Sequence, residues 1–479
     1  MEQHIPGIVL KDGLTQPVFD YKRCLFEKVY VETPVDTDGD GRLDLIAVYI
    51  RRPLETTQGM RVPAIYVANP YMLECNEDWY VPHDVDRDVS PYPQQHITES
   101  DITFDPSTVS FPQPRYPRAT VGYADTAPTE EIPLDCISDW YSYFNSRGYA
   151  SVFCGGLGTR GSQGFNCCGS PEETAAFKAV IDWLNGRCRA FTNLTDNIEI
   201  RADWCTGKVA MSGKSYLGTM CIAVASTGVE GLETIIPEAA ISNWYDYYRC
   251  NGLNLPAIGW QGDDLDILAK YCFSRAKDPE DYASVREAYA AWLEGIAADE
   301  DRDSGNYSRW WDMRNYLKAA DRFKASVFLV HGLADWNVKP THCVNLFAAM
   351  ESRGIPCKMM LHQGGHIYIH DLQGSRFNEM LHLWLDHWLY GIENGAAERI
   401  PNVLVQSNLD QDLWLASPSF PAVKGYTEPV LMPAQESGRL VDDLSATVYD
   451  RTRDNAAEWL AELVLSERHP HCLRYLTAP

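Results

Sequence analysis

The sequence predicts an α/β fold in which helices wrap a mostly parallel sheet, and three observations support this prediction. Short apolar runs typical of buried strands recur along the chain and alternate with amphipathic helical patterns. A glycine-containing turn at residues 212–218 joins one such strand directly to a helix. Two later strands each end in a loop that carries an acid or a histidine. Together they predict one α/β domain formed by residues 20–240 and 317–400.

Composition limits the kinds of partner and compartment. The 41 basic and 66 acidic side chains leave a formal charge of −25, which would repel nucleic-acid phosphates and anionic membranes. We therefore expect no nucleic-acid and no membrane partner. Residues 1–17 lack the pattern of a secretion signal, and no run of about 18 apolar residues occurs. We expect a cytoplasmic protein in which most of the 14 cysteines are reduced and buried.

The expected elements begin with a hairpin. Residues 25–34 and 43–52 alternate apolar and polar positions around a turn rich in Asp and Gly. The turn also resembles a calcium loop, but its twelfth position is Ala47 rather than glutamate, and strands rather than helices flank it. We predict no metal there. Further strands are expected at Val62–Ala68, Ala150–Cys154, Lys208–Ser212, Glu233–Ala239, Ser326–His331 and Lys358–His362.

Two helices carry clear start and stop signals. One follows the N-cap Ser170, with Glu173 completing a capping box and Gly186 past its end. The other follows Ser375 and ends at Gly391. Each has an apolar face, so both are expected to pack on the sheet.

Two segments interrupt the alternation of strands and helices. Residues 77–135, rich in Pro, Asp and Tyr, predict a long irregular excursion. Residues 241–316, rich in Trp and Tyr, predict a helical lid insertion that shapes access to a site. From residue 401 to residue 479 the chain becomes strand-like again, which predicts the beginning of a C-terminal β domain.

The turn at residues 212–218 carries the strongest chemical signal. A turn this sharp between strand and helix projects Ser215 beyond the edge of the sheet. The usual pattern is G-x-S-x-G, and here the second glycine comes one residue late, at Gly218. A serine hydroxyl becomes an effective nucleophile only when a base removes its proton. Ser215 therefore requires a histidine and an acid from elsewhere in the chain.

Asp335 and His366 supply these groups in the order typical of α/β-hydrolases. Each lies just after the end of a later strand. This agreement predicts a triad of Ser215, Asp335 and His366 on an α/β-hydrolase fold. His362, His366 and His370 are spaced like metal ligands, but no HExxH pattern accompanies them and the neighbouring glycines indicate a loop.

A dinucleotide cofactor is not expected either. Residues 156–161 match G-x-G-x-x-G directly after a strand. A dinucleotide fingerprint opens a helix at its last glycines, whereas the capped helix here begins only at Pro171. The sequence thus predicts no cofactor and no metal.

The motifs around the triad resemble those of the Xaa-Pro dipeptidyl-peptidases, serine exopeptidases in the wider group that includes cocaine esterase and cephalosporin acylases. The resemblance rests on residues 213–219, 331–338 and 363–368 and extends over most of residues 25–400. It implies an acyl-enzyme on Ser215. The implied reaction removes an N-terminal dipeptide with proline, or less well alanine, as its second residue from peptides with a free N-terminus.

The resemblance also implies a set of binding residues. The family's oxyanion hole uses a tyrosine hydroxyl and the backbone N–H after the nucleophile, which match Tyr71 and Tyr216. The family's glutamate for the substrate α-ammonium group matches Asp263, which is one methylene shorter. The family's proline pocket matches Trp244, Tyr247, Tyr248, Asn337 and Val338.

Three functions stay open at this point. An esterase or β-lactam acylase could use the same triad, since acyl transfer does not distinguish an ester from an amide. Longer family members begin with a helical domain used in dimerisation and end in a β jelly-roll. This chain reaches only Pro479, so we expect an incomplete C-terminal β domain. The third expected function, suggested by that incomplete domain, is a non-catalytic binding protein or an inert fragment. The resemblance leaves a homodimer open.

Overall fold

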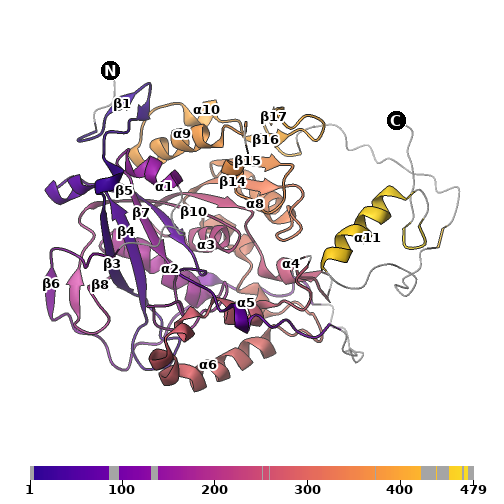
Figure 1. Ribbon diagram of the computed structural model, residues 1–479, viewed down its shortest axis with the longest axis horizontal. Coiled ribbons are helices and arrows are strands. Elements are labelled where there is room, and N and C mark those ends of the chain that lie inside the picture. The colour runs from indigo at the N-terminus through magenta and orange to yellow at the C-terminus, as the bar shows by residue number, and fades with distance from the viewer. Residues whose placement is uncertain are drawn as a thin grey trace.

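A long twisted sheet forms the centre of the protein, and helices pack against both of its faces (Figure 1). The computed structural model describes residues 5–85, 97–130, 139–250, 252–257, 259–372, 374–421, 438–439, 453–466 and 469–472. Within these ranges the sheet has 13 strands. From one edge to the other their order is β17 (Trp414–Ser417), β16 (Val403–Gln406), β15 (Cys357–His362), β14 (Ser326–Gly332), β11 (Leu232–Glu238), β10 (Cys205–Lys214), β5 (Val62–Ala68), β7 (Ala150–Cys154), β4 (Leu45–Arg52), β3 (Leu25–Glu32), β8 (Ala190–Phe191), β9 (Ile198–Ile200) and β6 (Gly122–Ala124).

The strands in the middle of the sheet run parallel. From β7 through β5, β10, β11, β14 and β15 to β16 every pairing is parallel, whereas β4 is antiparallel to both of its neighbours. Parallel strands place their carboxyl ends at one edge of the sheet. The loops after β10, β14 and β15 therefore meet at that edge. This is the α/β-hydrolase fold that the sequence predicts.

All six strands expected between residues 62 and 362 are confirmed, and so is the hairpin. β5 and β7 have the predicted bounds, and β10 departs most, since it extends from Cys205 to Lys214. In the hairpin, Leu25 of β3 pairs with Arg52 of β4, and Glu32 pairs with Leu45. Both faces of β4, β5 and β7 are buried, which explains their nearly continuous apolar sequences.

Side chains of each strand alternate between the two faces of the sheet. In β10, Val209 and Met211 pack in the core formed with α2 (Pro171–Leu184), α3 (Tyr216–Ala225) and α8 (Thr341–Glu351). Ala210 points the other way, into the core that α1 (Asp139–Asn145) and α9 (Phe377–Tyr390) cover. The two predicted helices, α2 and α9, therefore pack on opposite faces.

The start of α2 differs from the predicted capping box in one respect. Ser170 is the N-cap, and its hydroxyl oxygen accepts hydrogen bonds from the N–H groups of Glu172 and Glu173. The Glu173 carboxylate accepts from the N–H of Gly169 rather than from that of Ser170. A capping box requires the N-cap N–H, so this part of the prediction is wrong. The displacement leaves Glu173 pointing toward another partner, described below.

Residues 241–316 hold α4 (Trp244–Tyr248), the short pair β12 (Arg249–Cys250) and β13 (Leu253–Asn254), α5 (Leu265–Cys272), α6 (Pro279–Asp299) and α7 (Arg309–Asp312). α5 and α6 lie together at the lower side of Figure 1. A buried ion pair of 2.9 Å between Arg249 and Asp264 ties the start of α5 to the end of α4. The role of this segment as a lid stays a prediction.

The first strands after residue 401 extend the central sheet. β16 pairs in parallel with β15, and β17 pairs antiparallel with β16. Apart from short 3-10 helices, the other described elements are α10 (Ala396–Arg399), the N-terminal pair β1 (Leu10–Lys11) and β2 (Leu14–Thr15), and α11 (Arg453–Leu465). Most of residues 422–479 lie outside the described residues, so the separate C-terminal β domain stays a prediction.

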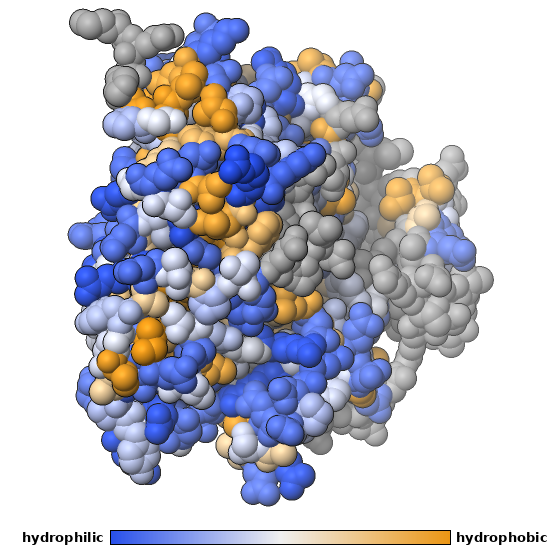
Figure 2. Space-filling view, turned by 60° about the vertical axis from the view of Figure 1, so that its left-hand side comes forward, coloured by the Kyte–Doolittle hydropathy of each residue, from blue (hydrophilic) through white to orange (hydrophobic). Residues whose placement is uncertain are grey.

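Hydrophilic side chains cover most of the face seen in Figure 2, and apolar ones gather in separate patches. Such a surface is consistent with the formal charge of −25. Within the described ranges, every helix is too short or too polar to cross a membrane.

Candidate active site

A cavity of about 420 Å³ lies where the central parallel strands end. Ser215 follows β10, Tyr71 follows β5, and Asn337 follows β14, so separate loops bring these residues together. The described residues that line the cavity are Tyr71, Glu77, Tyr80, Ser215, Tyr216, Ile241, Trp244, Tyr247, Tyr248, Trp260, Asp263, Leu268, Tyr271 and Asn337. Aromatic rings dominate this set, and it contains acidic but no basic side chains.

The backbone at Ser215 has the strain expected of a nucleophile on a tight turn. Its φ of 62° and ψ of −127° are costly for a residue with a Cβ. A Cβ on Gly213 would come within 2.4 Å of the Leu217 Cβ, and one on Gly218 within 2.6 Å of the Gly213 carbonyl oxygen. The Leu217 side chain thus fits because residue 213 is glycine, and the second glycine is needed at position 218. This explains why the turn tolerates a leucine in place of the usual second glycine.

Asp335 and His366 are joined by a short hydrogen bond. His366 Nδ1 lies 2.7 Å from Asp335 Oδ2. The other carboxylate oxygen accepts hydrogen bonds from the N–H groups of Asn337, at 2.9 Å, and Val338, at 3.0 Å. These three donors stabilise a carboxylate whose side chain is fully buried. The bond to Asp335 assigns the proton to Nδ1 and leaves Nε2 of His366 as the acceptor for a substrate-side proton.

Two other histidines support the loops around this pair. His331 Nε2 lies 2.8 Å from the Val338 carbonyl oxygen, and burial lowers the pKa of His331. His362 Nδ1 accepts from the Gly364 N–H at 3.1 Å, and burial lowers the pKa of His362 to about 4. Both imidazoles therefore stay neutral at pH 7. They hold loop geometry rather than carry charge.

Tyr71 and Tyr216, the predicted oxyanion donors, lie side by side next to Ser215. Their rings meet edge to face with centroids 5.8 Å apart. The Tyr216 hydroxyl points away from the cavity and donates to the two oxygens of Glu173, at 2.8 and 2.9 Å. Tyr216 could thus offer its backbone N–H to the cavity, whereas Tyr71 would offer its hydroxyl. Both roles stay predictions.

Glu173 is a residue whose place in the site the sequence did not reveal. It is fully buried under Tyr216, and burial raises the pKa of Glu173 to about 7. The sequence pattern suggested only a local role for Glu173, at the start of α2. Its contact with Tyr216 joins two residues 43 positions apart, a relation that no local pattern encodes.

The residues predicted to hold proline form a flat aromatic wall. Trp244 and Tyr248 lie nearly parallel, at 21°, with centroids 6.4 Å apart. The Tyr247 hydroxyl donates to Asn337 Oδ1 at 2.7 Å, which fixes both side chains. Val338 does not line the cavity, and its side chain is completely buried elsewhere in the core. Its backbone N–H instead donates to Asp335.

Asp263 is buried in the same cavity with an incomplete set of partners. Its Oδ2 accepts from the Tyr248 hydroxyl at 3.2 Å. Its Oδ1 is also buried and has no hydrogen-bond partner among the described residues. Burial raises the pKa of Asp263 to about 7. A cationic group in the cavity would find an acceptor here.

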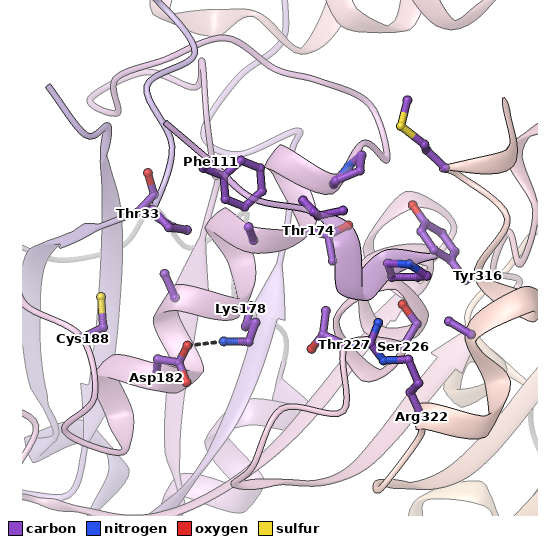
Figure 3. Close-up of a pocket in the computed structure, with 18 of the residues that line it drawn as sticks. Thr33, Phe111, Thr174, Lys178, Asp182, Cys188, Ser226, Thr227, Tyr316 and Arg322 are labelled. Carbon is purple, nitrogen blue, oxygen red and sulfur yellow. Dashed lines mark hydrogen bonds and ion pairs between the residues drawn. The ribbon is translucent and has the colours of Figure 1, made fainter. Parts of the chain in front are cut away.

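A larger cavity of about 590 Å³ lies elsewhere, against the outer face of α2 (Figure 3). Lys178 and Asp182 of α2 form an ion pair of 2.5 Å on its wall, and Tyr316 and Arg322 lie across from them. None of the predicted site residues lines it. The predicted nucleophile, Ser215, lines the smaller cavity instead.

Comparison with known proteins gives results of two kinds. Residues 38–368 match the model of the family described as X-Pro dipeptidyl-peptidase (S15 family). The chain is 40% identical over 469 residues to an Xaa-Pro dipeptidyl-peptidase of Pediococcus pentosaceus, covering 95% of this chain and 57% of that protein. It is 41% identical over 473 residues to one of Lactiplantibacillus plantarum, with the same coverage of 95% and 57%.

Among solved structures, a CocE/NonD family hydrolase from Staphylococcus aureus matches at 14% identity with a TM-score of 0.48, over 85% of this chain and 63% of that one. The chain thus spans somewhat more than half the length of the curated relatives it matches.

Proposed function

Because the chain belongs to the S15 family of X-Pro dipeptidyl-peptidases, we propose that it is a serine exopeptidase that releases N-terminal Xaa-Pro dipeptides from peptides. Xaa-Ala dipeptides would be released less well. One observation supports this most strongly: Ser215 and the buried, under-bonded carboxylate of Asp263 line the same cavity. A nucleophile and an acceptor for a cation in one cavity of about 420 Å³ suit a substrate that is cleaved close to its free N-terminus.

The proposed reaction begins at Ser215. His366 takes the hydroxyl proton while Ser215 attacks the carbonyl carbon of the second residue. Asp335 holds the imidazole in place and stabilises its positive charge. The Tyr71 hydroxyl and the Tyr216 N–H donate to the oxyanion. His366 then protonates the leaving amine, and water releases the dipeptide from the acyl-enzyme by the reverse sequence.

Two features set the proposed specificity. The substrate α-ammonium group donates to Asp263, whose free oxygen gains the partner that it lacks, and Glu77 adds negative charge to the same cavity. The parallel rings of Trp244 and Tyr248 form an apolar surface for the flat proline ring. A substrate without a free N-terminus leaves Asp263 buried and unpaired, which is costly.

Hydrolysis of an Ala-Pro arylamide tests the proposal. We expect release of the chromophore by the wild-type chain and none by Ser215→Ala. N-acetylation of the substrate should abolish release. Equal cleavage of the acetylated substrate would exclude an exopeptidase. Hydrolysis of aryl esters without any Xaa-Pro activity would favour the esterase or acylase alternative, and an inert chain that no fluorophosphonate labels would favour a non-catalytic fragment.

Compartment and assembly belong to the same proposal. All thirteen cysteines within the described residues are unpaired, which suits the reducing cytoplasm. A homodimer stays a prediction from the family resemblance. Sedimentation velocity at several protein concentrations tests it, and a single monomeric species throughout would exclude it.

A further inference from the structure

His83, Asp266 and Glu300 form a cluster beside the cavity that the proposed reaction does not use. Their three ligand atoms, one from each side chain, lie within 4.8 Å of one another. His83 Nε2 is 2.9 Å from Asp266 Oδ1 and 4.0 Å from Glu300 Oε1. Two ligands bound to one ion about 2.1 Å from each would lie roughly 3 to 3.5 Å apart. Small side-chain movements would therefore bring all three within reach of one ion.

Glu300 is the unusual member of the cluster. Its side chain is completely inaccessible to solvent. One oxygen, Oε2, accepts from the Asp266 N–H at 3.2 Å. The other, Oε1, points toward His83 and has no hydrogen-bond partner among the described residues. Buried carboxyl oxygens are normally paired, so this oxygen requires an explanation.

The neighbouring charges do not supply a partner for Glu300. Arg249 lies close, but its guanidinium is paired with Asp264 and donates to the Glu300 backbone carbonyl rather than to its carboxylate. Arg302 is also paired with Asp264. Burial, with the charges of Asp264 and Asp266, raises the pKa of Glu300 to about 10. A cation beside Oε1 would offset the burial of this carboxylate.

We propose that His83, Asp266 and Glu300 bind one divalent transition-metal ion, with Zn²⁺ the best fit to one imidazole and two carboxylates. The ion would give Glu300 Oε1 a partner and compensate two buried negative charges. The His83 side chain is 33% exposed, which leaves a path for the ion and room for a water ligand.

Such an ion would join three segments that meet at the cavity wall. His83 belongs to the irregular segment after β5, and Asp266 belongs to α5. Glu300 is the first residue after α6. Tyr80 and Asp263, three residues before His83 and Asp266, both line the cavity. The backbone is already tightly fitted there, because a Cβ on Gly262 would lie 2.1 Å from the His83 carbonyl oxygen. The proposed role is to hold the binding wall together.

The test uses the full chain, stripped of metal by a chelator, with Zn²⁺ and Co²⁺ as probes. We expect one Zn²⁺ per chain by calorimetry and a higher thermal midpoint when it is bound. Bound Co²⁺ should show visible absorption without the intense near-ultraviolet band of thiolate ligands. His83→Ala should weaken Zn²⁺ binding by at least about 100-fold. His387→Ala, which removes a histidine from α9, is the matched control and should bind like the wild type.

Glu300→Gln separates a metal ligand from a purely structural residue. The amide can still accept from the Asp266 N–H and carries no charge, so the metal-free variant should unfold at or above the wild-type midpoint. The variant should nevertheless lose the increase that Zn²⁺ gives. The proposal is wrong if the wild type binds no stoichiometric Zn²⁺, if His83→Ala binds it unchanged, or if Co²⁺ binds through thiolates. It is also wrong if Glu300→Gln lowers the midpoint equally with and without Zn²⁺.

Discussion

Asp335 and Asp263 are both buried carboxylates, but only Asp263 lines the cavity around Ser215, and their hydrogen-bond partners differ. Asp335 receives hydrogen bonds from one imidazole and two backbone N–H groups. Asp263 receives one from Tyr248, and its second oxygen has no partner among the described residues. The first has hydrogen-bond partners for both of its oxygens without a ligand. The second is costly to ionise until a cation arrives, as a selective binding group should be.

The largest effect is expected from Asp335→Asn. Its side-chain amide would donate to His366 Nδ1 and favour the tautomer that carries its proton on Nε2. That tautomer cannot accept the Ser215 proton, so kcat for an Ala-Pro arylamide should fall by about 10⁴-fold. KM should change little. Steady-state kinetics check this, and a loss below about 10-fold would show that Asp335 is not the orienting acid.

Asp263→Asn should have a smaller and more selective effect. Loss of a charged hydrogen-bond acceptor should reduce kcat/KM for free dipeptidyl arylamides by about 10- to 100-fold. Aryl esters that lack an amino group should be hydrolysed as before. Asp203→Asn, which neutralises an exposed acid outside the cavity, is the matched control and should cleave both substrate classes like the wild type. Equal losses on both substrate classes would mean that Asp263 acts on structure rather than on the ammonium group.

The sequence predicted the roles of the two carboxylates in different ways, and it did not predict their different hydrogen bonding. The prediction of the triad came from local patterns, because each member lies just past a strand end and parallel strands gather those ends at one edge. Asp263 came from the family resemblance alone. Its missing hydrogen-bond partner depends on where the chain packs around α5, which composition and spacing do not encode.

Long-range pairings account for what the sequence did not predict. β16 and β17 were expected in a separate domain, yet they pair with β15 and with each other, since an unpaired sheet edge offers the same hydrogen bonds to any strand that reaches it. Glu173 under Tyr216 and Glu300 beside His83 are contacts between distant segments. Periodicity, caps and turn residues report only on neighbours within a few positions.

A pH profile sharpens the comparison further. Because burial raises the pKa of Asp263 to about 7, the carboxyl group is largely protonated at pH 6 and ionised at pH 8. The ratio of kcat/KM for an Ala-Pro arylamide to kcat/KM for an aryl ester should therefore rise as the pH increases through 7. Using the ratio cancels any pH dependence of the catalytic step that the two substrates share. A ratio that stays flat between pH 5.5 and 7.5 would contradict the assignment.

The smallest effect is expected from Tyr248→Phe. The change removes the one side-chain hydrogen bond to Asp263 Oδ2 but keeps the aromatic wall. The loss of a neutral donor should raise KM for the arylamide by about 3- to 10-fold. Since this bond lowers the pKa of Asp263, the rise in the pH ratio should also move to higher pH in the variant. An unchanged profile would mean that Tyr248 only packs.

Covalent labelling by a dipeptidyl phosphonate tests the central claim most directly. Ala-Pro diphenyl phosphonate forms a stable adduct with a nucleophilic serine, and mass spectrometry of the digested protein locates it. The account predicts an adduct on Ser215 that forms at least about 100-fold faster with a free than with an acetylated N-terminus, because only the free amine gives Asp263 a charged donor. Equal rates for the two reagents, or an adduct on another residue, would contradict it.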